Sequence, residues 1–106
     1  MSIHTANIFA YRLKLARKEK KLSQERLGIL AGVEESSASA RMNQYERGKH
    51  VPDYLMLTRI AQALDLPPAY FYTEDDVLAE IIKYCHQMTE QQKSEVLAEV
   101  KNLYFK

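Results

Sequence analysis

The sequence predicts an all-α protein, because its apolar residues recur at helical spacing and few residues break helices. Three glycines and three prolines among 106 residues leave too few turn formers for a many-stranded β architecture. Hydrophobic content of 46% and charged content of 27% are typical of a soluble globular domain. No apolar run reaches the roughly 18 residues of a transmembrane helix, and the start lacks a signal-peptide pattern. We therefore expect a soluble cytoplasmic protein without a membrane partner, and the single cysteine also favours a reducing compartment.

The first two predicted helices lie in a basic stretch. Residues 7–20 carry two apolar stripes at spacings of three and four residues, which are Ile8, Tyr11 and Leu15, and Phe9, Leu13 and Ala16. This pattern predicts an amphipathic helix with its basic residues outside. Ser23 can cap a short second helix, and Gly32 can end it because glycine adopts the left-handed conformation without strain. Gly28 lies inside that helix, where glycine costs about 1 kcal/mol relative to alanine, so we expect another backbone to pack closely against it.

Five further helical segments follow. The third helix is expected from about Ser36 to Arg47, and the fourth begins after Asp53, a capping residue. Their predicted buried faces are Ala38, Met42 and Tyr45 in the third helix, and Leu57, Ile60, Ala61 and Leu64 in the fourth. Residues 67 and 68 are prolines that start a short helical turn through Tyr72, and Thr73 is expected to cap a sixth helix. A capping box of Thr89 and Gln92 opens a seventh helix over about residues 90–103.

The charge is divided unequally along the chain. Residues 1–52 hold ten lysines and arginines against five acidic residues, a balance of +5, whereas residues 53–106 hold five against nine, a balance of −4. A basic half can bind a phosphate backbone while an acidic half stays in solvent or meets a partner. The alternative is that basic residues such as Arg12 and Lys18 only solvate a helix face. Charge alone does not decide between the two interpretations.

Signatures of catalysis and of cofactor binding are missing from the sequence. The three scattered glycines cannot form a phosphate-binding loop. His4, His50 and His86 lack metal-ligand spacing with each other or with Cys85. Cys85 lies on an apolar helical stripe, which favours a buried structural thiol over a nucleophile. We therefore expect no enzyme activity, no cofactor and no metal site.

The second and third helices carry an extended motif. Its parts are Leu22-Ser23-Gln24-Glu25-Arg26-Leu27, then Leu30-Ala31-Gly32-Val33, then Met42-Asn43-Gln44-Tyr45-Glu46-Arg47-Gly48-Lys49 with Pro52. This motif resembles the Cro/repressor family of helix-turn-helix regulators, and residues 57–64 with Tyr70-Phe71 fit the last two helices of that family. The whole layout is similar to the controller proteins of restriction–modification systems. The resemblance implies a five-helix repressor-like DNA-binding domain over residues 1–73. The two extra C-terminal helices, residues 74–106, would then form a dimerisation extension packed on the same core.

One departure from the family concerns the start of the third helix. The segment from Val33 to Glu46 is longer than usual by about four residues, close to one helical turn. Either the recognition helix is extended at its N-terminus, or the turn carries a small acidic loop. The family's residue roles therefore carry over securely only from Arg41 onward.

By that resemblance the DNA-binding residues lie at the start of the second helix, along the third and just past it. Gln24 is expected to contact phosphate, which the helix dipole also favours. The amides of Asn43 and Gln44 can pair with adenine in the major groove, and Arg41 or Arg47 with guanine. The remaining candidates are Ser36, Ser37 and Ser39 for bases or phosphates, Ala40 for a thymine methyl group, and Lys49 and His50 for the DNA backbone. For each candidate base reader, two other roles fit the sequence equally well: a solvated residue on the helix surface, or a contact to phosphate. Glu46 is expected to fix the helix end, because phosphate would repel its carboxylate.

These observations predict a sequence-specific regulator that binds double-stranded DNA as a homodimer on a near-palindromic operator. It would act at a promoter by occlusion or by recruitment, the latter through contact with RNA polymerase. Dimerisation is expected through residues 74–105, with half-sites centred roughly 10 base pairs apart. The Tyr70–Tyr72 turn is the alternative interface. An alternative from another class is an antitoxin-type module whose acidic helical half binds a partner protein.

Overall fold

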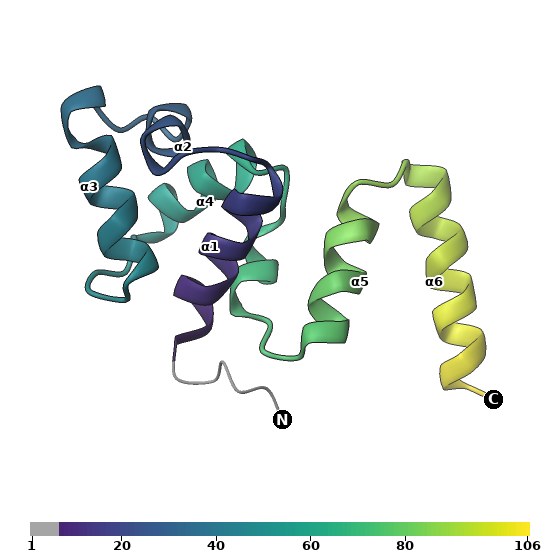
Figure 1. Cartoon of the computed structure of the whole chain (residues 1–106). Coiled ribbons are helices and arrows are strands. Elements are labelled where there is room, and N and C mark those ends of the chain that lie inside the picture. The colour runs from purple at the N-terminus through teal and green to yellow at the C-terminus, as the bar shows by residue number, and fades with distance from the viewer. Residues whose placement is uncertain (1–6) are drawn as a thin grey trace.

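The computed structural model describes residues 7–106, which form six α-helices and one 3₁₀ helix (Figure 1). The elements are α1 (Ile8–Glu19), α2 (Gln24–Leu30), α3 (Glu35–Glu46), α4 (Tyr54–Ala63), η2 (Pro68–Tyr72), α5 (Asp76–His86) and α6 (Glu90–Tyr104). There is no strand among these residues, so the predicted all-α fold is confirmed. His4 and the other residues before Asn7 lie outside the described part of the chain. None of the helices in residues 7–106 is long and apolar enough to cross a membrane.

The core lies among α1, α2, α3, α4 and η2. Its largest fully buried side chains are Phe71, Leu13, Leu27, Met42, Leu57, Ile60 and Leu64. The buried faces predicted for the third and fourth helices are confirmed, because every residue named for them is buried. α5 adds Ala79 to this core, with Ile82 packed against it. The first five elements therefore form one packed body, to which α5 is attached.

Capping residues set most helix starts as the sequence predicts. The side chains of Ser23, Asp53 and Thr89 each accept a hydrogen bond from a backbone N–H in the first turn of α2, α4 and α6. Thr89 and Gln92 form the expected capping box. The prediction that Thr73 caps the sixth helix is wrong, because α5 is capped by Asp75, which accepts from the N–H of Leu78 at 2.9 Å.

A buried arginine explains the late start of α5. Arg12 of α1 is only 2% exposed, so the expectation that the basic residues of this helix all face outward is wrong. Its Nε and Nη2 donate to the carbonyl oxygen of Thr73 at 3.0 and 2.8 Å, and Nη2 also donates to that of Glu74 at 3.2 Å. Both residues are thereby held beside α1 in a non-helical segment, and the helix begins only at Asp76.

The C-terminal helices leave much apolar surface uncovered. α6 has no buried residue, and Cys85 of α5 is half-buried where a buried thiol is expected. The exposed apolar residues on the two helices are Val77, Leu78, Ile81, Tyr84, Leu97, Val100, Leu103 and Tyr104. α6 and α3 lie at opposite ends of the molecule (Figure 1). The end of the molecule farthest from α3 therefore exposes several large apolar side chains among its charged ones.

Candidate nucleic-acid interface

The helices α2 and α3 form a tight two-helix unit. The turn between them contains Gly32 with a φ of +90°, as expected for a left-handed helix stop. Gly28 of α2 faces Ala38 of α3 so closely that an added Cβ would lie 2.7 Å from the Ala38 Cβ. The same Cβ would lie 2.9 Å from the Ala38 carbonyl oxygen. The close backbone approach predicted for Gly28 is confirmed, and it fixes how α3 sits on α2.

The extra residues after Val33 extend the third helix and do not form a loop. α3 begins at Glu35, directly after the N-cap residue Glu34, and continues for 12 residues to Glu46. Ser36 and Ser37 thus occupy its first turn. The helix offers a longer face to a partner than the family pattern implies.

The predicted site residues gather on this unit and differ in exposure. Eight of them are exposed along α3 and the turn after it: Ser36, Ser39, Ala40, Arg41, Gln44, Arg47, Lys49 and His50. Three are half-buried: Gln24, Ser37 and Asn43. Ala38, Met42 and Tyr45 occupy the opposite, buried side of α3. α3 therefore presents short polar, amide and guanidinium side chains to solvent.

A hydrogen-bonded network holds α3 against α1 and α2. The carboxylate of Glu46 is 3% exposed and accepts from both Nε and Nη2 of Arg17, the latter at 3.0 Å. The side-chain amide of Gln24 donates to Glu46 Oε1 at 3.1 Å and lies 3.3 Å from Asn43 Oδ1. The expectation that Glu46 has a structural role is confirmed. The sequence did not point to Arg17 as its partner, since the two residues are 29 positions apart.

This network constrains what Gln24 and Asn43 can contact. The Gln24 amide group directs its donors at Glu46 and Asn43. The amide nitrogen of Gln24 has only two N–H donors. Its side chain can therefore donate to phosphate only if it gives up its hydrogen bond to Glu46 or to Asn43. Asn43 Oδ1 accepts from Gln24, which leaves the amide nitrogen of Asn43 to act as a donor toward a partner.

Among residues 7–106, no group of three or more His, Cys, Asp and Glu side chains could hold a metal ion. The Arg17–Glu46 pair and the residues packed beneath α3 are the most buried parts of the site, and Gln24, Ser37 and Asn43 are half-buried. The exposed face can therefore act through hydrogen bonds and positive charge.

Comparisons with known proteins place the chain in a family. A family described as a helix-turn-helix domain matches residues 10–77. The chain belongs to this family, and the predicted Cro/repressor-type helix-turn-helix fold is confirmed. A solved structure titled as the crystal structure of transcriptional regulator BswR is 42% identical and has a TM-score of 0.81. That match covers 88% of this chain and 92% of the other. Comparison with curated proteins gives no significant match.

Proposed function

We propose that the chain is a transcriptional regulator that binds double-stranded DNA at a specific, near-palindromic operator and acts as a homodimer. The observation that carries this proposal is the exposed face of α3, which bears serine, amide and guanidinium side chains. Beyond its first turn, α3 exposes no carboxylate to a phosphate backbone, because Arg17 covers Glu46. In helix-turn-helix proteins the second helix of the motif lies in the major groove. The similarity to transcriptional regulator BswR also supports a regulatory role.

The site residues divide into those that read bases and those that contact the backbone. Gln44 and Arg41 are exposed on α3 and have the donor and acceptor geometry to read adenine and guanine in the major groove. Asn43, held by Gln24, presents its amide beside them. Lys49 and His50, which are exposed just past the helix, would contact phosphate. The first half of the chain, with its balance of +5, adds a favourable field for DNA.

The C-terminal helices supply the proposed dimer interface. Val77 and Tyr84 of α5 and Leu103 of α6 are 70%, 57% and 67% exposed, and no residue of α6 is fully buried. Large exposed apolar patches mark interaction sites in soluble proteins. A second copy of the same surface, related by a two-fold axis, would cover them. Because α3 lies at the far end of the molecule, this pairing leaves both recognition helices free (Figure 1).

This arrangement corresponds to a DNA-binding domain over residues 1–73 and a dimerisation extension over residues 74–106 that meets the same core through Ala79. Bound at a promoter, the dimer would act by occluding it or by contacting RNA polymerase. The narrower role that we propose is that of a restriction–modification controller. The alternative is an antitoxin-type module that binds a partner protein through its acidic helical half, residues 53–106.

Selection of bound sequences from a random DNA pool tests the proposal. We expect a motif with two-fold symmetry, and affinity for it should fall steeply with salt as counterions are released. Selection without any enriched sequence, or an affinity that does not change with salt, would contradict DNA recognition and favour a protein partner. Identification of the neighbouring gene would then separate a controller from an antitoxin.

A further inference from the structure

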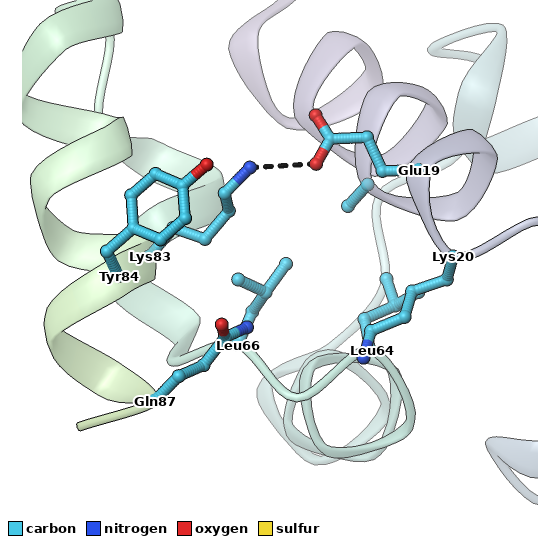
Figure 2. A pocket seen from close by; sticks show the side chains of 8 residues that line it. Glu19, Lys20, Leu64, Leu66, Lys83, Tyr84 and Gln87 are labelled. Carbon is cyan, nitrogen blue, oxygen red and sulfur yellow. Dashed lines mark hydrogen bonds and ion pairs between the residues drawn. The ribbon is translucent and has the colours of Figure 1, made fainter. Parts of the chain in front are cut away.

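Two ion pairs join α1 to α5 in a matched pattern. Near the start of both helices, Arg12 Nη2 lies 2.9 Å from Asp76 Oδ1. Near the end of both helices, Lys83 Nζ lies 2.8 Å from Glu19 Oε2 (Figure 2). On each helix the two charged residues are seven positions apart, which is two helical turns or about 10 Å. Each helix therefore presents both of its charges from one face.

The order of the charges selects a single alignment of the two helices. α1 carries its positive residue first and its negative residue second, whereas α5 carries them in the opposite order. Both pairs form together only when the helices run parallel and in this register. An antiparallel arrangement, or a shift of two turns, would place Arg12 opposite Lys83 or Glu19 opposite Asp76. Like charges in contact would then oppose the packing.

The basic side chain of each pair is buried, whereas its carboxylate partner is exposed. Arg12 and Lys83 are 3% and 12% exposed, and their partners Asp76 and Glu19 are 58% and 44% exposed. Burial alone would lower the pKa of Lys83, but hydrogen bonds from its ammonium to Glu19 and Glu80 raise that pKa above the usual value. Ala79, 1% exposed, lies between the two pairs along α5. Lone exposed ion pairs contribute little, whereas a buried charge that loses its partner is strongly destabilising.

We propose that these two pairs, here named the α1–α5 clasp, set the half-site spacing that the dimer accepts on DNA. Arg12 and Lys83 are then positioning residues, and this inference rests on the proposed function. The mechanical path is continuous: Arg17 ties α3 to α1, the clasp ties α1 to α5, and α5 carries part of the proposed dimer face. Two recognition helices enter the same operator only when their separation matches one helical turn of DNA or a multiple of it.

The experiment measures affinity for operators whose half-sites are moved apart or together by single base pairs. Each added base pair displaces one half-site by about 3.4 Å and rotates it by about 34°. The variants are Arg12→Met and Lys83→Met, which keep an apolar stem and remove the charge. Arg59→Met is the matched control, because Arg59 is exposed on α4 and lies outside the clasp and outside the surfaces proposed to bind DNA or a second copy. Affinity for a single half-site and the sedimentation of the free protein are measured alongside.

We expect the wild-type chain and the control to lose affinity by about 5- to 150-fold away from the preferred spacing, the usual range of coupling between sites. In the clasp variants the ratio of affinity at the preferred spacing to affinity at other spacings should be at least about fivefold smaller than in the wild-type chain. Their affinity for a single half-site and their dimerisation should stay unchanged. The double variant Glu19→Lys/Lys83→Glu, which restores opposite charges, should recover the preference that either single reversal loses.

Clasp variants that fold, dimerise and keep the wild-type spacing preference overturn the inference. If Arg12→Met does not fold, Lys83→Met and the charge-reversed pair decide the question. A wild-type chain that binds no sequence specifically, or that shows no preferred spacing, overturns the proposed function and this inference with it. A wild-type preference that the clasp variants retain overturns the inference alone.

Discussion

Replacing Gly28 by alanine tests the closest contact between α2 and α3. The new Cβ would lie 2.7 Å from the Ala38 Cβ, 2.9 Å from its carbonyl oxygen and 3.0 Å from its Cα, whereas ordinary contacts begin near 3.4 Å. No rotamer change relieves this clash, because backbone atoms of α3 take part in it. The two helices must move apart, and such overpacking costs about 1–3 kcal/mol. Alanine returns about 1 kcal/mol of helix propensity, so we expect a net loss of stability.

After the gain in helix propensity is subtracted, the expected net loss for Gly28→Ala is up to about 2 kcal/mol in the free energy of unfolding, measured by urea denaturation. The double variant Gly28→Ala/Ala38→Gly removes one of the two clashing methyl groups. It should lose less stability than the sum of the single variants, with a coupling of about 1 kcal/mol. An unfolding midpoint for Gly28→Ala at or above the wild-type value would refute the reasoning. So would strictly additive effects in the double variant.

Four further changes test the network, the DNA-facing surface and the dimer. Glu46→Gln should cost about 2–3 kcal/mol of stability by leaving the guanidinium of Arg17 without its carboxylate; an unchanged unfolding midpoint would argue against this. Gln44→Ala should weaken operator binding by about 1–3 kcal/mol and relax one base position, and unchanged sequence preference in a repeated selection would count against it. Lys49→Ala should weaken binding to all sequences and reduce the salt slope by about 1, so a loss confined to one sequence would contradict a phosphate contact. Truncation after Gln87 should give a monomer by sedimentation, and a dimer as tight as the full chain would place the interface elsewhere.

The sequence by itself determined the local structure of this chain. Caps such as Ser23, Asp53 and Thr89 act within one helical turn, so their effect is visible from residue spacing alone. The buried faces of α3 and α4 follow from helical periodicity for the same reason. The close approach at Gly28 was predictable, because a glycine inside a helix lowers helix stability and is expected where a neighbouring backbone leaves no room for a side chain. The helix-turn-helix resemblance came from the motif residues themselves, which run from Leu22 to Val33 and from Met42 to Lys49.

Only the tertiary structure decided how charged residues far apart in the sequence pair. Arg12 and Arg17 look like solvated basic residues of an amphipathic helix, yet their partners lie 64 and 29 positions away. Arg12 holds residues 73 and 74 in a non-helical segment, so α5 is capped by Asp75 and not by Thr73 as predicted. Whether the residues after Val33 extend α3 or form a loop was likewise open, because both outcomes satisfy the local pattern. Packing of α3 on Gly28 through Ala38, which lies within those added residues, stabilises the helical outcome.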